Sequence, residues 1–273
     1  MKILIVGSNS ILSKAILIEH QSDQVDMIYH DKPTDYYSNL IHISKLNELG
    51  DNYDLVYLVS AIIRNNVDDT ELLFDVNVKL IQTISNLFKS ARLIYFSTVA
   101  VYDALESGFI DEKTKASPCS FYGISKLWGE RIVSQHKKYT IIRISSLYGE
   151  GMKQTTFLPI IIKDALTKGR ITLLGDGSRK QNYISVSDVA VLAKKLALMD
   201  QNMLQLAVGE FSYSNKQIAE ILQNILSCEI IYSGFDNTRS VEYNQNTIPY
   251  DEYNLVNIEK GIKTLITWIK EQY

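Results

Sequence analysis

Two linked segments decide the fold of this chain: I-Y-F-S-T-V-A-V-Y-D at residues 94–103 and S-F-Y-G-I-S-K at residues 120–126. The β-branched and aromatic residues 94–96 follow A-R-L at residues 91–93, which predicts the end of a buried strand. Ser97 and Thr98 follow that strand, at the carboxyl end where open α/β sheets bind their ligands. A helical pattern begins at Ser120. The predicted order is therefore strand, polar loop, helix.

Tyr122 and Lys126 lie four positions apart on this predicted helix and so share one face, with Cβ atoms about 5–6 Å apart. A free phenol loses its proton near pH ~10, but an adjacent ammonium and a positively charged nicotinamide ring would lower that pKa. Tyr122 would then exchange a proton with a sugar or alcohol hydroxyl, while Thr98 hydrogen-bonds the same oxygen. The spacing alone fits equally a surface helix with a half-buried tyrosine and a solvated lysine.

The composition bounds the class of protein. With 273 residues, 46% of them hydrophobic, the chain can form one large domain or a domain with a lobe. A net charge of −3 without a long basic run argues against nucleic acid or an anionic membrane as partner. Two cysteines indicate reduced thiols, and no apolar run reaches the ~20 residues needed to cross a bilayer. The start M-K-I-L-I-V-G lacks a signal-peptide layout, so we expect a soluble, cytoplasmic protein.

The first turn has the layout of a dinucleotide site. A short apolar strand at residues 2–6 ends in Gly7, and G-S-N-S-I-L-S leads into an amphipathic helix. This order aims a helix amino terminus and backbone N–H groups at a pyrophosphate. Ser10 and Ser13 stand where glycine would let backbone and helix approach closely. Taken alone, the segment fits an ordinary strand–helix turn equally well.

Asp31 follows a second predicted strand, residues 25–30, and stands 24 positions after Gly7. A carboxylate there accepts hydrogen bonds from both adenosine ribose hydroxyls and would repel a 2′-phosphate, which favours NAD. Lys32 beside it leaves NADP open. The alternative is a turn aspartate before Pro33.

Strands and helices alternate along the first half of the chain. Further strands are predicted at 53–60, 91–96 and 139–144, and helices at 75–87 and 121–136. This alternation predicts an α/β fold with a doubly wound parallel sheet in residues 1–150. Residues 151–273 are predicted to be mainly a smaller substrate lobe that closes over the sheet's edge, although later segments can return to the sheet. Its predicted elements are helices at 157–166, 188–199, 215–226 and 258–271, a strand at 183–186 and a polar loop at 236–254.

The sequence shows no signal for a metal site and none of the common hydrolase or P-loop motifs. The four histidines, His20, His30, His42 and His136, have no metal-ligand spacing with cysteines or acids. The chain has no G-x-S-x-G, P-loop lysine or H-E-x-x-H motif. We therefore expect no metal.

Five ordered segments together resemble one family: F-S-T-V-A-V-Y, Y-G-I-S-K, V-N-V-K, R-I-S-S-L-Y-G and L-G-D-G-S-R-K-Q-N-Y-I-S-V-S-D-V-A. They resemble the extended short-chain dehydrogenase/reductase family, specifically its NAD-dependent epimerase/dehydratase group acting on nucleotide sugars. The resemblance covers nearly the whole chain. It implies an NAD(P)-binding Rossmann-type sheet, a nucleotide-sugar substrate, a role in polysaccharide biosynthesis and a homodimer as the assembly.

The resemblance also assigns site residues. The implied catalytic residues are Thr98, Tyr122 and Lys126. The implied cofactor residues are Gly7, Ser10, Ile11, Leu12, Asp31, Ser60, Ala61 and Asn77, together with Tyr122 and Lys126. The residues implied to contact the sugar or nucleotide are Thr98, Ser145, Ser146, Phe157 and Gln181.

The chain departs from the family pattern at several positions. Two turn glycines are serine, and no aspartate for adenine occurs around residues 42–44. Gln181 stands where many members carry an arginine on the nucleotide diphosphate, which puts the usual uridine-diphosphate preference in doubt. Val99 and Ala100 replace the Asp-Glu pair of 4,6-dehydratases. Because elimination of water needs an acid and a base beyond the tyrosine, we predict that this chain is not a 4,6-dehydratase.

Two reactions at a sugar carbon remain open, 4-ketoreduction and epimerisation. R-I-S-S-L-Y-G and the short chain favour a reductase, whereas Asp31, which favours NAD, suits an epimerase that recycles its bound cofactor. A different class is a non-catalytic dinucleotide sensor or scaffold of the same fold, suggested by the two serines in the first turn. Against it, such a protein does not need Thr98, Tyr122 and Lys126 together.

Overall fold

The computed structural model describes residues 1–105, 109–111, 113–243 and 255–272 and divides into two compact units. The first unit comprises Met1–Leu105, Glu112–Ile144 and Val189–Ala207, and the second comprises Glu106–Asp111, Ser145–Asp188 and Val208–Tyr273. The chain thus leaves the first unit near residue 144 and returns to it for one helix and one strand.

A seven-stranded parallel sheet forms the centre of the first unit, in the order β11-β7-β5-β4-β1-β2-β3. Its strands are β1 (Lys2–Val6), β2 (Gln24–Tyr29), β3 (Leu40–His42), β4 (Leu55–Leu58), β5 (Arg92–Thr98), β7 (Tyr139–Ile144) and β11 (Met203–Ala207). The chain builds outward from β1 to β3, then returns to the other side of β1 as β4. The sheet order therefore reverses between β1 and β4, the place where doubly wound sheets bind ligands.

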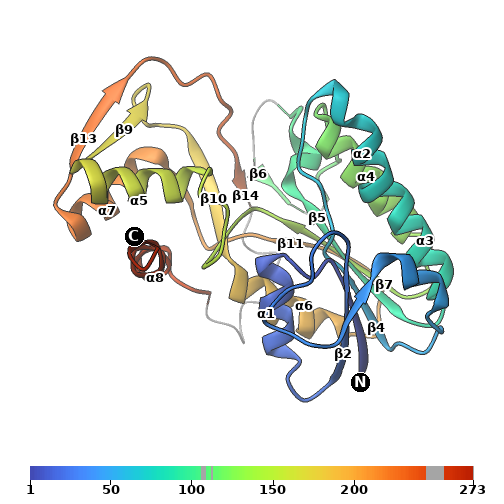
Figure 1. The fold of residues 1–273 in the computed structure, drawn as a ribbon. Coiled ribbons are helices and arrows are strands. Elements are labelled where there is room, and N and C mark those ends of the chain that lie inside the picture. Colours follow the sequence, from blue (N-terminus) through green and yellow to red (C-terminus); the bar gives the residue numbers. More distant parts are fainter. Residues whose placement is uncertain (106–108, 112, 244–254, 273) are drawn as a thin grey trace. The chain divides into compact units, whose positions relative to one another are not determined.

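Helices cover both faces of this sheet (Figure 1). α1 (Ile11–Glu19) and α6 (Val186–Ala197) lie on one face, where the Lys194 ammonium donates to the Glu19 carbonyl. The other face carries α2 (Thr70–Phe74), the π-helical η3 (Asp75–Lys79), α3 (Leu80–Leu87) and α4 (Phe121–Val133). Because both faces are covered, β1 and β4 are nearly continuous apolar runs and do not alternate apolar with polar residues. The doubly wound parallel sheet predicted from the sequence is confirmed.

The core follows the pleat of the strands. Leu4 and Val6 of β1 pack in one apolar cluster with Ile81 and Ile84 of α3, while Ile3 and Ile5, which alternate with them, are buried on the opposite face. Alternate residues of a strand point to opposite faces, so one strand supplies both layers.

The structure differs from the sequence prediction at several elements. β3 and β11 were not predicted: β3 has only three residues, and β11 carries Gln205 within an otherwise apolar run. The helix predicted from residue 75 begins at Thr70 and passes through the π-turn of η3. Short 3-10 segments, η1 (Ile43–Glu48), η2 (Val67–Asp69) and η4 (Val99–Tyr102), occupy parts of the connecting loops.

The second unit has small sheets and its own core. β8 (Ser146–Tyr148), β10 (Lys180–Ser185) and β12 (Ser212–Ser214) form one sheet; β9 (Arg170–Leu174) pairs with β13 (Glu229–Ser233), and β6 (Phe109–Ile110) with β14 (Glu242–Tyr243). α5 (Phe157–Lys168), α7 (Asn215–Leu226) and α8 (Ile258–Lys270) share a buried apolar cluster with β9. β14 lies in the stretch predicted as a polar loop, and residues 244–254 of that stretch are outside the described residues. Within the described part of the chain, every helix is too short or too polar to cross a membrane.

A glycine in α4 lets this helix lie close to the sheet. A Cβ at Gly129 would sit 2.2 Å from the hydroxyl oxygen of Tyr95 in β5. We expect Gly129→Ala to lower the free energy of unfolding by about 1–3 kcal/mol, because overpacking displaces a buried ring. Urea denaturation followed by circular dichroism measures it. Gly50→Ala is the control, since the nearest atom to its Cβ lies at 3.9 Å. Equal stability of the two variants would contradict this packing.

Candidate functional site

The turn after β1 is shaped by one close approach. Gly7 has φ +106°, and a Cβ there would lie 2.6 Å from Ser60 Oγ and 2.8 Å from the Ser60 nitrogen. Ser60 N donates in turn to the Val6 carbonyl at 2.8 Å. The ends of β1 and β4 therefore touch at the point where the sheet order reverses, and only glycine fits between them.

The serines that replace glycines in this turn make hydrogen bonds of their own. Ser10 caps α1 by accepting from the Leu12 N–H at 3.1 Å, and the fully buried Ser13 hydroxyl donates to the Gly7 carbonyl at 2.5 Å. Both serines thus hold the turn against the helix. The buried Ser8 Oγ has no hydrogen-bond partner, so the turn retains one unsatisfied polar atom beside the amino terminus of α1. Ile11 and Leu12 open that helix, with Leu12 in the core.

Asp31 and Ala61 flank this turn along the same edge of the sheet. β2 and β4 both pair with β1, so the residues that follow them end near Gly7. Asp31 is exposed, and its Oδ1 lies 2.7 Å from Nδ1 of the equally exposed His30. Ala61 is exposed as well. The carboxylate therefore faces solvent at the position predicted for a ribose contact.

Asn77 is fully buried and uses its amide within the protein. It accepts from the Ile62 N–H at 2.9 Å and donates to the Ile62 carbonyl at 3.0 Å. Its amide also donates to Ser125 Oγ in α4 at 2.9 Å. Asn77 therefore ties the segment after β4 to the helix that carries Tyr122. The contact of Asn77 with a cofactor stays a prediction.

Thr98 and Tyr122 are brought together across the β5–α4 connection. Thr98 ends β5, and Tyr122 lies in the first turn of α4. Burial raises the pKa of Tyr122 to about 12, and the nearby Thr98 hydroxyl opposes this shift. At neutral pH the phenol is thus protonated and can donate a proton.

Lys126 lies one helical turn further on and is 1% exposed. Its Nζ stands 4.2 Å from the ring centroid of Tyr95, a cation–π arrangement. Burial lowers the pKa of Lys126 to about 7, and the Glu130 carboxylate opposes this shift. The ammonium is therefore close to its titration midpoint at neutral pH, where small changes of the local field change its charge.

The residues predicted to contact substrate lie in the second unit. Ser145 donates to Asn182 Oδ1 at 2.8 Å, and Gln181 Nε2 donates to Asn215 Oδ1 at 3.3 Å. Ser146 is exposed on β8, next to β10, which carries Gln181. Phe157 begins α5 and is half-buried against the core of this unit. Ser146 and Gln181 thus share one small sheet, Ser145 directly precedes β8, and Phe157 belongs to a helix.

The sequence prediction missed a buried polar cluster beneath Thr98 and Lys126, formed by Ser97, Tyr102, Glu130 and Arg143. One signal for it exists in the sequence. Arg143 interrupts the apolar strand T-I-I-R-I, and a charged residue in a buried strand requires a partner. Nothing local identifies that partner as Glu130.

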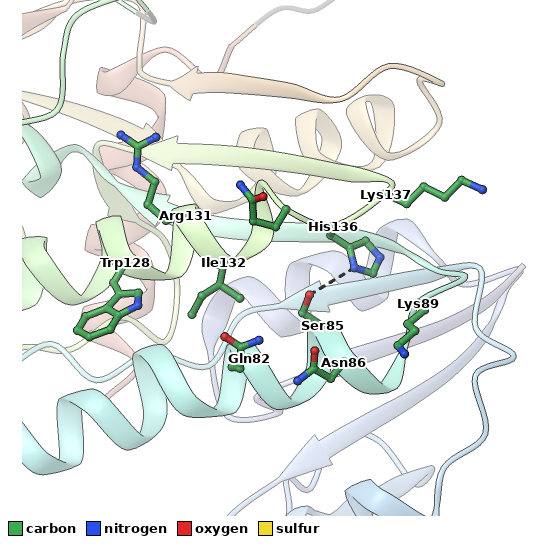
Figure 2. Close-up of a pocket in the computed structure, with 10 residues that line it drawn as sticks. Gln82, Ser85, Asn86, Lys89, Trp128, Arg131, Ile132, His136 and Lys137 are labelled. Carbon is green, nitrogen blue, oxygen red and sulfur yellow. Dashed lines mark hydrogen bonds between the residues drawn. The ribbon is translucent and has the colours of Figure 1, made fainter.

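A groove elsewhere on the first unit contains none of the predicted site residues. Figure 2 shows it between α3 and α4, with Gln82, Ser85 and Asn86 on one side and Trp128 and Ile132 on the other. Lys89, Arg131 and Lys137 make its lining basic. No group of three histidine, cysteine or acidic side chains able to hold a metal occurs in the described ranges.

Comparison with known proteins gives one family and a consistent fold. The model of the "NAD dependent epimerase/dehydratase family" matches residues 3–205. A putative UDP-glucose 4-epimerase of Methanocaldococcus jannaschii is 25% identical over 232 residues, which cover 76% of this chain and 73% of that protein. An uncharacterized UDP-glucose epimerase of Bacillus subtilis is 29% identical over 130 residues, 42% of this chain, and the match spans 41% of that protein's length.

Solved structures agree on the fold. The UDP-glucuronic acid 4-epimerase of Bacillus cereus in complex with NAD matches with a TM-score of 0.86 at 21% identity, covering 100% of this chain and 97% of that one. The dTDP-glucose 4,6-dehydratase of Bacillus anthracis in complex with NAD matches with a TM-score of 0.81 at 17% identity, covering 99% and 97%. At such identities the likeness establishes the architecture and leaves the reaction open.

The burial of Lys126 makes folding depend on pH in a defined direction. Unfolding returns the lysine to its ordinary pKa of about 10.4, whereas in the folded chain the pKa is about 7. Between these values the unfolded chain binds more protons, so stability rises with pH. We expect the free energy of unfolding of the wild type, relative to Lys126→Met, to increase by up to about 1.4 kcal/mol per pH unit from about pH 7.5 to 9.5.

Urea denaturation across this range measures the difference. Lys260→Met, at an exposed position of α8, is the control and should show the same difference from wild type at every pH. If the free energy of unfolding of Lys126→Met differed from that of the wild type by the same amount at every pH, the lowered pKa of the buried Lys126 would be contradicted.

Proposed function

Because this chain belongs to the NAD-dependent epimerase/dehydratase family, we propose that it is an NAD-dependent oxidoreductase that acts on a nucleotide sugar at a sugar carbon. The family resemblance predicted from the sequence is confirmed by the match over residues 3–205. The observation that carries the proposed reaction is the nearness of the Thr98 hydroxyl to the Tyr122 phenol, whose pKa it lowers, with the buried Lys126 one helical turn away. Thr98 ends β5 at the carboxyl edge of the parallel sheet, where such folds bind ligands.

The residues around the first turn fit a dinucleotide. Gly7 permits close approach, the amino terminus of α1 with its Ser10 cap suits a pyrophosphate, and the unsatisfied Ser8 hydroxyl lies beside it. Ile11, Leu12, Ser60, Ala61 and Asn77 complete the proposed cofactor residues. The exposed Asp31 would accept from the ribose hydroxyls and so favours NAD, while Lys32 leaves NADP as a second option. NAD, when bound, supplies the hydride acceptor and donor.

The chain's own residues would handle the proton. Tyr122, protonated at neutral pH, donates to a carbonyl oxygen in reduction and removes a hydroxyl proton in oxidation. Thr98 holds the phenol and the reacting oxygen in line. The Lys126 ammonium favours the phenolate, so it lowers the cost of the oxidative direction.

The proposed contacts of the sugar nucleotide in the second unit are Ser145, Ser146, Phe157 and Gln181. Gln181 is neutral, so it would give a diphosphate a hydrogen bond and no charge. Because the usual arginine is absent, we do not assign uridine as the base of the nucleotide. A nucleotide sugar is consistent with polysaccharide biosynthesis and with the cytoplasmic location predicted from the sequence.

The choice between 4-ketoreductase and epimerase remains open, and we propose that 4,6-dehydration is excluded. Val99 and Ala100 begin η4 directly after Thr98, at the positions where 4,6-dehydratases carry their acidic pair. Neither side chain can exchange a proton, so the elimination lacks its acid and base. The fold shared with the dehydratase of Bacillus anthracis does not bear on this point, because one fold serves both reactions.

The alternative function is a dinucleotide sensor or scaffold. Its motivation was the pair of serines in the first turn, and both serines make structural hydrogen bonds there. Calorimetry with NAD and NADP, combined with turnover assays, separates the classes. A dinucleotide sensor binds a dinucleotide without turnover of any nucleotide sugar, and binding of neither dinucleotide at millimolar concentration would contradict the proposed enzyme and favour a scaffold.

The central test is Tyr122→Phe, which removes the hydroxyl and keeps the ring. We expect turnover to fall by ~10²–10⁴, the usual loss for a positioned acid or base, while NAD affinity and thermal stability stay nearly unchanged. Turnover is followed with 4-keto and 4-hydroxy sugar nucleotides. Net consumption of NAD(P)H identifies a reductase, and interconversion without consumption identifies an epimerase. Activity within a few-fold of wild type would refute the role of Tyr122.

We also propose that the predicted homodimer forms through the face of α2 and α4. Leu72, Ile124 and Trp128 are 41%, 45% and 51% exposed there, and Phe74 packs edge-on against Trp128. The face has opposite charges at its ends. Asp68, Asp69 and Glu71 lie at one end, and the basic residues that line the groove, Lys89, Arg131 and Lys137, lie at the other. A second copy across a two-fold axis, with its helices antiparallel, would bring acidic ends onto basic ends.

Trp128→Asp should therefore shift the chain from dimer to monomer in sedimentation velocity at micromolar concentration, because it places a charge at the centre of the apolar face. Phe235→Asp is the matched control, since Phe235 is 89% exposed in the second unit. A monomeric wild type, or a Trp128→Asp variant that sediments as a dimer, would exclude this interface.

A further inference from the structure

A buried ion pair lies directly beneath the proposed catalytic residues. Glu130 of α4 and Arg143 of β7 form two parallel hydrogen bonds, Nε to Oε1 at 2.9 Å and Nη2 to Oε2 at 2.6 Å. Both side chains are almost fully buried, with exposed fractions of 4% and 6%. Glu130 is one helical turn from Lys126 on the same helix, so the two side chains share a face.

The pair joins the elements that carry Thr98 and Lys126. Ser97, the residue before Thr98, donates to Glu130 Oε1 at 2.5 Å. Arg143 Nη1 donates to the Tyr102 hydroxyl at 2.5 Å, and the guanidinium stacks on the Tyr102 ring at 4.9 Å. Tyr102 ends η4, the short helix that Thr98 caps. One carboxylate and one guanidinium thus connect β5, η4, α4 and β7.

Stability alone does not explain such a pair. Removing two charges from water costs several kcal/mol per ion, and apolar residues of the same volume often serve as well or better. The cost is offset here by bidentate geometry and by hydroxyl partners on both sides. A buried charge held this firmly can instead act on a neighbour, because the field of a charge is weakly screened in the interior.

We propose, building on the proposed function, that Glu130 is a positioning residue which keeps Lys126 in its ammonium form beside Tyr122, and that Arg143 holds Glu130 in place as a carboxylate. Lys126 does not touch the ion pair through any hydrogen bond that the structure shows, so the action is electrostatic. Its consequence is that a cation is held one helical turn from Tyr122 when the phenol must release its proton.

The surroundings of Lys126 support this assignment. Tyr95 of β5 supplies a ring face, and Tyr122 on the same helix turn is protonated at neutral pH. On the packed segment η3, Asp75 and Lys79 pair with one another at the surface, 2.6 Å apart. Glu130 is the acid whose charge raises the pKa of Lys126 against the lowering by burial, which leaves it at about 7. Without that carboxylate the lysine would be mostly neutral at pH 7.

The test is a titration of Lys126 itself, in the chain without substrate. Lysine labelled with 13C at Cε is followed by NMR against pH, and the Lys126 signal is assigned by its absence in Lys126→Met. In Glu130→Gln the pKa of Lys126 should fall by roughly one pH unit, the usual effect of losing an adjacent opposite charge. The limb of the pH–rate profile that reports loss of the Tyr122 proton should move to higher pH by a similar amount.

A double variant separates charge from folding. Glu130→Gln leaves Arg143 buried and unpaired, which destabilises the chain, whereas Glu130→Gln/Arg143→Met removes both charges and should recover much of the stability. The pKa of Lys126 should stay low in the double variant, because the carboxylate is still missing. If the single variant does not fold, the double variant alone decides the question. Tyr53→Phe is the matched control: it removes a hydroxyl that donates to the Asp26 carboxylate at 2.8 Å, far from Lys126 in the sequence and in the sheet.

Two results would overturn the assignment. One is a Lys126 pKa that is unchanged in either variant, and the other is a pKa that returns to the wild-type value together with stability in the double variant. Because the titration needs no turnover, it is independent of the proposed reaction. A wild type inactive on every nucleotide sugar would refute the proposed function while leaving the titration result intact.

Discussion

The burial of one ammonium group constrains the centre of this protein. Lys126 is a buried residue of α4, and its Nζ lies over the ring of Tyr95. The helix approaches that ring closely because Gly129 has no side chain. An isolated ammonium in such a place would lose its proton, and burial moves its pKa to about 7. The nearby Glu130 carboxylate, itself paired with Arg143, limits this shift. The packing of α4 on β5 and the charge of Lys126 therefore depend on each other.

A second constraint acts where the sheet order reverses. The ends of β1 and β4 meet at Gly7 and Ser60. The contact leaves no room for a side chain at position 7. Serines replace glycine at two nearby positions without disrupting the turn, because Ser10 caps α1 and Ser13 donates back to the Gly7 carbonyl. Replacing these glycines by serine therefore adds side-chain hydrogen bonds to the turn.

The fold leaves the reaction open because relatives with this architecture catalyse different reactions. An epimerase and a 4,6-dehydratase match the chain almost equally well. What differs between such enzymes lies in a few side chains at the ends of strands. In this chain the proposed acid/base is Tyr122, and Thr98 at the end of β5 is followed by the apolar Val99 and Ala100.

The sequence by itself determined the strand–helix alternation of the first unit, the Gly7 turn and the shared helical face of Tyr122 and Lys126, because periodicity and spacing are local properties. It did not reveal β3 and β11, which are short or carry a polar residue and are strands only because they pair with the sheet. The tertiary structure alone decided that Asn77 binds Ile62 and Ser125, and that Ser97, Glu130 and Arg143 form one cluster. These partners are 13–48 residues apart in the chain, and only the packing of η3 and α4 against the sheet brings them into contact.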